Sequence, residues 1–79
     1  MIYEGAEARI LEIEAPSDLR CYIELYGKWR TSRLATQMIH AGITIFVEVL
    51  TDMKQPETYR IYFKKDARKI VQKILEGNY

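Results

Sequence analysis

The sequence predicts an α+β fold in a single domain spanning residues 1–79, with a three-stranded antiparallel sheet and helices packed on one of its faces. Three observations support this prediction. A chain of 79 residues is long enough for one compact domain. Segments with helical spacing alternate with segments whose polarity changes at every residue. Each predicted element has one apolar side, so helices and sheet must cover each other.

The first two elements lie on either side of Pro16. Residues 7–14 alternate in polarity, which predicts a strand. Ser17 is then a candidate N-cap for a helix in which residues 19, 22, 23 and 26 share one face, and Gly27 would end it. The same segment also has apolar residues at 19, 21, 23 and 25. We predict a helix, and a strand over residues 19–26 is the alternative.

The remaining elements follow in a clear order. Thr31 or Ser32 can cap a helix with an apolar stripe formed by residues 34, 35, 38 and 39, and Gly42 suits its C-terminal end. Residues 43–50 are rich in β-branched and aromatic residues, which predicts a strand. A polar turn over 52–57 leads to a second hairpin strand over 58–63. Asp66 is expected to cap a last helix that ends at Gly77. The predicted order is β-α-α-β-β-α.

Composition excludes several classes of protein. Cys21 is the only cysteine, so an intramolecular disulfide is excluded and we expect a reducing, cytoplasmic location. No apolar stretch reaches the length of about 18 residues that a membrane-spanning helix needs. Glu4 and Glu7 stand where a signal peptide would carry basic residues, so we expect none, and no membrane partner.

Charge is unevenly distributed along the chain. Residues 1–26 carry two basic and six acidic residues, whereas residues 27–79 carry ten basic and five acidic ones. The net charges are therefore −4 and +5. Residues 25–47 contain Lys28, Arg30 and Arg33 and no acidic residue. Such asymmetry is typical of an anion-binding surface, and a solvated face of a near-neutral protein is the alternative.

The predicted element order and the residues from 27 to 45 resemble the eukaryotic-type KH domain. Gly27-Lys28-Trp29-Arg30 stands at the position of the family's Gly-x-x-Gly loop, and Thr31–Ala41, Gly42 and Ile43-Thr44-Ile45 stand as the following helix, break and strand. The segment KKDARKIVQKIL resembles its last helix. The resemblance implies binding of RNA or single-stranded DNA. Arg30 replaces the second loop glycine, so the usual backbone approach to phosphates is obstructed, although its guanidinium could contact a phosphate itself.

A second resemblance rests on ARILEIEAPSD at residues 8–18 and on the length of the chain. These features resemble the small dimer-forming subunit of the KEOPS tRNA-modification complex, which is KH-related. This resemblance implies a subunit that acts through protein–protein contacts, as a homodimer or in a larger complex.

Two groups of residues are candidates for binding. Lys28, Trp29, Arg30 and Arg33 combine cations with an aromatic ring that we expect in a loop, which suits phosphate neutralisation with base stacking. The alternative is a tryptophan folded back onto the edge of the domain, with solvated basic neighbours. Phe46, Arg60 and Tyr62 are candidates for partner binding, because Arg60 and Tyr62 should share the hairpin face opposite Tyr59 and Ile61. An aromatic and basic face of this kind suits a nucleic acid as well as a protein partner. A further basic group near the last helix is interpreted as a solvated face; it comprises Lys64, Lys65, Arg68, Lys69 and Lys73.

No pattern in the sequence indicates catalysis. His40 is the only histidine, and no cluster of His, Cys and Asp has the spacing of a metal site. Glu12 and Glu14 share a predicted strand face without a sign of a cleft. No glycine-rich phosphate loop is present. We therefore expect a non-enzymatic module without cofactor or metal that binds RNA, tRNA among them, or single-stranded nucleic acid. The alternative function is a small dimer-forming or adaptor subunit of a larger complex.

Overall fold

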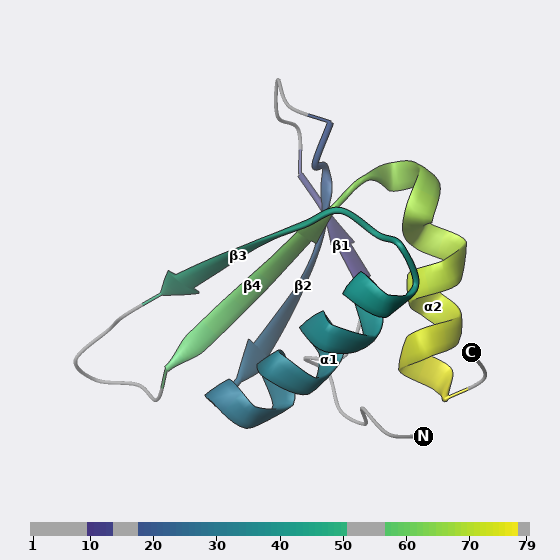
Figure 1. Cartoon of the computed structure of the whole chain (residues 1–79). Helices are drawn as coiled ribbons and strands as arrows, with labels where there is room; N and C mark the ends of the chain where they lie inside the picture. Colours follow the sequence, from purple (N-terminus) through teal and green to yellow (C-terminus); the bar gives the residue numbers. More distant parts are fainter. Residues whose placement is uncertain (1–9, 14–17, 51–56, 78–79) are drawn as a thin grey trace.

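The computed structural model describes residues 10–13, 18–50 and 57–77. The order of elements is β1 (Ile10–Glu12), β2 (Cys21–Tyr26), α1 (Lys28–His40), β3 (Ile45–Leu50), β4 (Thr58–Phe63), the 3-10 turn η1 (Lys65–Ala67) and α2 (Arg68–Glu76). The fold is thus α+β with an antiparallel sheet, as predicted. Both helices lie on the same side of the sheet (Figure 1). No helix within the described part of the chain is long and apolar enough to cross a membrane.

Within the described residues, the sheet has four strands in the order β1-β2-β4-β3, not the predicted three. All three strand pairs are antiparallel, so β2 and β4 are central while β1 and β3 form the edges. The register places Ile23 opposite Ile61, and Ile61 opposite Val47. These three side chains point to the side of the sheet that carries the helices. The residues before and after each of them point to the opposite face.

The predicted helix before Gly27 is wrong, because Cys21–Tyr26 form the strand β2. Cys21, Ile23 and Leu25 are fully buried against the helices, and the intervening side chains lie on the other face. Both periodicities were present in the segment, and backbone pairing on both sides of β2 favours the extended form. The order is therefore β-β-α-β-β-α, which differs from the KH order on which the resemblance rested. Ser17, the proposed cap of that helix, lies outside the described residues.

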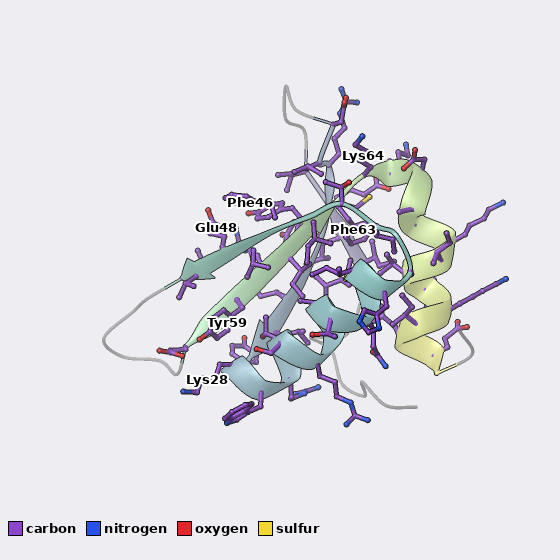
Figure 2. The ribbon with its side chains drawn as sticks, in the orientation of Figure 1. Lys28, Phe46, Glu48, Tyr59, Phe63 and Lys64 are labelled. Atoms are coloured by element: carbon purple, nitrogen blue, oxygen red, sulfur yellow. The ribbon has the colours of Figure 1, made fainter. Side chains whose placement is uncertain are left out.

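The core lies between the sheet and the two helices. Its fully buried side chains include Ile23, Ile61 and Phe63 from the central strands. Leu34 and Met38 of α1 are also fully buried, whereas Ile39, predicted to belong to the same stripe, is 59% exposed. Helix α2 contributes the side chains of Val71, Ile74 and Leu75. Figure 2 shows Phe63 directed into the space between sheet and helices.

Glycines end both helices as predicted. Gly42 has a φ of 80°, and its N–H donates a hydrogen bond to the carbonyl of Ile39. Gly77 is left-handed and donates in the same way to Ile74. A positive φ suits glycine because it has no Cβ. Gly42 therefore lets the chain turn from α1 toward β3, and Gly77 ends α2.

The helix starts differ from the predictions. Helix α1 begins at Lys28, so Thr31 lies within it and is buried, and its hydroxyl donates to the carbonyl of Gly27 at 2.9 Å. Asp66 lies in η1 and makes no side-chain cap; the N-cap of α2 is Ala67. The first strand is described only over Ile10–Glu12. The predicted turn over 52–57 lies outside the described residues except for Glu57.

Candidate functional site

Gly27 determines where α1 begins, and with it the position of the candidate nucleic-acid residues. Its φ is 87° and its ψ is 137°, which lets the chain leave β2 and enter the helix within one residue. Its N–H donates to the carbonyl of Glu57 at 3.1 Å, and its carbonyl accepts bonds from the N–H and the hydroxyl of Thr31. The start of α1 is therefore tied to the chain just before β4.

The basic–tryptophan cluster comprises Lys28, Trp29, Arg30 and Arg33, and the structure brings all four into the first six residues of α1. Trp29 therefore lies in a helix and not in the predicted loop. Its side chain is 79% exposed, more than any other large apolar side chain among the described residues. Lys28 and Arg33 are exposed, and Arg30 is half-buried.

Helical spacing sets how these side chains are arranged. Trp29 and Arg33 are four residues apart, so they lie next to each other on the side of α1 away from the buried Leu34 and Met38. The Nζ of Lys28 lies 5.6 Å from the centre of the Trp29 ring, which is a cation–π distance. The indole is thus flanked by a lysine and an arginine at the outer surface. Figure 2 shows Lys28 at the N-terminal end of α1.

The electrostatic setting of the cluster is unusual for a helix start. The N-terminus of a helix carries a partial positive charge, and acidic residues are favoured there. The first turn of α1 contains no acidic residue and instead contains cations. Their charges add to the helix dipole, so the local potential favours an anion.

The second candidate group lies on the sheet face opposite the helices, which we call the open face. The register places Tyr22 opposite Tyr62, and Tyr62 opposite Phe46, so three aromatic rings form a row across β2, β4 and β3. The ring centres are 5.5 Å apart for Tyr22 and Tyr62 and 6.1 Å apart for Phe46 and Tyr62. Phe46 is 55% exposed. Arg60 and Tyr62 share this face, opposite to Ile61, as the pattern indicated.

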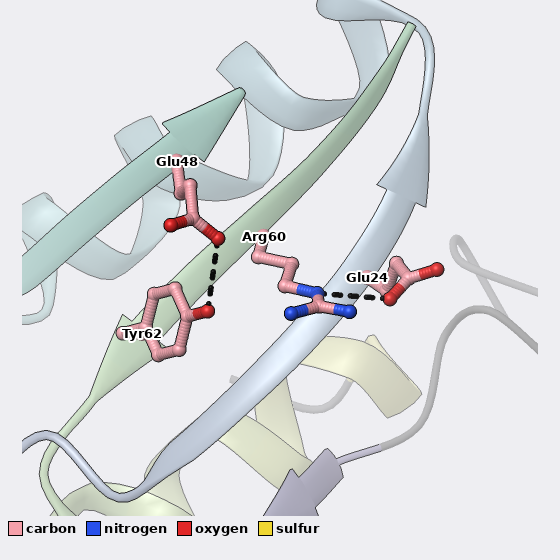
Figure 3. A network of polar contacts seen from close by, with 4 residues as sticks. All are labelled: Glu24, Glu48, Arg60 and Tyr62. Carbon is pink, nitrogen blue, oxygen red and sulfur yellow. Dashed lines mark hydrogen bonds and ion pairs between the residues drawn. The ribbon is translucent and has the colours of Figure 1, made fainter. Parts of the chain in front are cut away.

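Polar contacts join the charged and aromatic residues of the open face (Figure 3). The Nε of Arg60 donates to the carboxylate of Glu24 at 3.1 Å, and the hydroxyl of Tyr62 donates to Glu48 at 3.0 Å. The guanidinium of Arg60 also lies 5.0 Å from the centre of the Tyr22 ring. Hydrogen bonding to Tyr62 is the main cause that raises the pKa of Arg60, and the bond to Glu24 adds to it, so the group stays charged.

Sequence reasoning missed three members of the open face: Tyr22, Glu24 and Glu48. Tyr22 was assigned to a helix face and Glu24 was counted only as charge. The alternation of residues 21–26 was the signal that places Tyr22 and Glu24 on one side of a strand. Glu48 required knowledge of the strand register, because it meets Tyr62 only through the pairing of β3 with β4.

The other sequence candidates lie apart from both groups. His40 is in the last turn of α1, and Cys21 is fully buried in β2. Glu12 forms an ion pair with Arg68 of α2, while Glu14 lies outside the described residues. The basic residues 64, 65, 68, 69 and 73 are exposed around η1 and α2. Within the described ranges, no group of His, Cys, Asp and Glu side chains could hold a metal ion.

Comparison with known proteins gave no match. No protein-family model matches the chain, and neither a curated protein nor a solved structure is significantly similar to it.

Proposed function

We propose that this chain is a non-catalytic module that binds RNA or single-stranded DNA through the basic–tryptophan cluster. The observation that carries the proposal is the 79% exposed indole of Trp29 among cations at the start of α1. The indole ring of Trp29 presents a large apolar surface to water, and a base stacked on the ring would cover this surface. Stacking on an aromatic side chain contributes about 1–3 kcal/mol per base.

Each residue of the cluster has a defined part in this proposal. Trp29 stacks on one base, and Lys28 and Arg33 neutralise the phosphates on either side of it. Arg30, which is half-buried, contacts a phosphate nearer the body of the domain. The helix dipole and the three cations favour the same charge on the ligand. Because the contacts are to the phosphate backbone and to a ring face, little sequence preference is expected.

Direct titration tests the proposal. Trp29 is the only tryptophan, so its fluorescence reports on the cluster alone. Pooled tRNA and a single-stranded oligonucleotide of about ten residues should each quench it in a saturable way. The affinity should fall steeply between low and moderate salt, because each phosphate contact releases counterions. A folded protein whose emission is unchanged by either ligand contradicts the proposal.

Variants separate stacking from charge, with the anisotropy of a labelled oligonucleotide as the readout. Trp29→Ala should weaken binding about 5- to 150-fold, which is the stacking energy expressed as an affinity. Arg33→Gln should weaken it and lower the slope of log affinity against log salt by about one. Ile39→Ala is the matched control, because Ile39 is also exposed on α1 but near its other end. Equal affinity of the Trp29→Ala and control variants would eliminate the stacking role.

The open face favours a second candidate function, a small interaction subunit. Its aromatic row is accompanied by Arg60, which is paired with Glu24, and by Glu48, which is bonded to Tyr62. A face whose arginine is already neutralised and that carries two carboxylates repels phosphates. Aromatic residues with paired polar groups are instead typical of protein interfaces. For this function Phe46, Arg60 and Tyr62 contact the partner, and association should persist at high salt.

A further inference from the structure

We propose that the edge strand β3 pairs with β3 of a second copy, antiparallel and centred on Val47, so that two chains form one continuous eight-stranded sheet. This inference goes beyond nucleic-acid binding and does not depend on it. It gives the interaction-subunit alternative a specific occupant, namely a second copy of this chain.

The edge formed by β3 has the features that allow pairing. It is six residues long, and β4 is its neighbour on one side only in the described sheet. Its outer backbone N–H and C=O groups therefore form a row that another strand can join. Proteins commonly block such an edge with lysine, proline or a very short strand. Residues 45–50 contain neither lysine nor proline, and Glu48 is their only charged residue.

Apolar side chains are exposed along this strand. Val47 and Val49 are 40% and 52% exposed, although the register places them on the side of the sheet that carries the helices. Figure 1 shows β3 running away from the two helices, which accounts for this exposure. A second β3 strand paired about Val47 would cover Val47 with Val47 of the other chain and Val49 with Ile45 of the other chain. The second strand would therefore bury the apolar side chains of β3 that α1 leaves exposed on the helix side of the sheet.

Side-chain chemistry selects one register. A two-fold axis perpendicular to the sheet keeps both helix layers on one side and keeps the residues of the helix side next to each other. With the axis at Val47, Val47 faces its own copy, Ile45 faces Val49, and Phe46 faces Glu48. With the axis at Glu48, the two carboxylates would be directly opposite, which is unfavourable. Centring on Val47 avoids this repulsion and pairs all three branched side chains of the helix side.

The first measurement is the mass of the wild-type protein in solution. Light scattering at concentrations from about 10 to 500 μM should show a dimer whose fraction rises with concentration and does not fall at high salt. A monomer over the whole range overturns the inference. This result would leave nucleic-acid binding at the α1 cluster unaffected, so the two proposals fail separately.

Cysteine substitution on β3 tests the register. Directly opposite residues in antiparallel strands have Cα atoms about 4.5–5.5 Å apart, within disulfide range. Val47→Cys should therefore form a disulfide-linked dimer rapidly under mild oxidation, and Val49→Cys, which faces Ile45 of the other copy, should form it much more slowly. The buried Cys21 makes the wild-type chain the control for background oxidation. Equal rates for the two variants overturn the Val47 register.

Charge substitution at Phe46 provides a second test without a new thiol. In the proposed register, residue 46 of one copy faces Glu48 of the other. Phe46→Glu should therefore give a monomer, and Phe46→Lys should keep the dimer, although both lose the same ring contact with Tyr62. Circular dichroism shows whether each variant folds. If the two variants have the same oligomeric state, the opposition of residues 46 and 48 is wrong.

Discussion

Cys21 is a fully buried thiol in the central part of the sheet. Burial is the main cause that raises the pKa of this thiol, and the carboxylate of Glu12 adds to the effect, while Arg68 and Lys65 oppose it. Glu12 is the residue opposite Cys21 in the pairing of β1 with β2. The thiol therefore holds its proton more firmly in the folded chain than in the unfolded chain.

This difference predicts a loss of stability in alkali. Below about pH 8.5, thiols in both states are protonated and the contribution of Cys21 is fully present. As the pH rises further, the unfolded thiol ionises first, so the free energy of unfolding falls until the folded thiol also ionises. Urea unfolding at pH 7 to 10 should show a steeper alkaline decline for wild type than for Cys21→Ala. Parallel declines would show that other groups cause the effect.

At the residue scale, the sequence alone indicated which residues are candidates for binding, but not where those residues lie in the structure. Trp29 and its basic neighbours were recognisable because no acidic residue occurs between positions 25 and 47. Their placement on a helix was not predictable, because Gly27 reads equally well as the end of one helix or the start of another. Ile39 fitted the apolar stripe of α1 by spacing, yet the helix packs through Thr31, Leu34 and Met38.

At the element scale, α1 depends on the backbone of Gly27. An added Cβ there would meet no atom within 4 Å, so space does not explain the glycine. The backbone angles explain it, because residues with a Cβ rarely adopt a φ of 87° with a ψ of 137°. The same residue joins α1 to the chain before β4 through its bond to Glu57.

Gly27→Ala should therefore destabilise the domain although the site is open. The expected loss is about 1–3 kcal/mol in the free energy of unfolding, the usual cost of a strained backbone residue. Urea unfolding followed by circular dichroism measures it. Ser32→Ala, at an exposed position of α1, is the control and should change stability by less than about 0.5 kcal/mol. If the two variants are equally stable, backbone strain is not what selects glycine here.

Element prediction succeeded where a single periodicity was present. Residues 43–50 and 58–63 were expected as hairpin strands, and β3 and β4 lie within them. The last helix was also recognisable, since Val71, Ile74 and Leu75 are buried on one side. Residues 19–26 carried two periodicities, and the outcome depended on β1 and β4 offering hydrogen bonds on both sides of β2. Local sequence does not contain that information.

At the scale of the whole molecule, the two helices cover one sheet face, and among the described elements neither helix lies on the other face or along the β3 edge. A sheet of four strands with helices on one side follows from elements that each have one apolar side. The number of strands was not predictable, because the segment that became β2 was assigned to a helix. Basic and acidic groups are also separated in space, although Glu48 comes from the basic half of the chain. The basic–tryptophan cluster starts α1, while the acidic Glu24 and Glu48 lie on the open face.

The order of strands also affects how the chain folds. Strands β3 and β4 are neighbours in sequence, whereas the whole of α1 and β3 separates β2 from its partner β4. Closing that long loop costs entropy before the pairing returns any stability, so the hairpin should form first and β2 should join late. Ile23→Val should then cost about 0.5–1.5 kcal/mol. In stopped-flow experiments it should mainly speed unfolding, whereas slower refolding would place β2 in the folding nucleus.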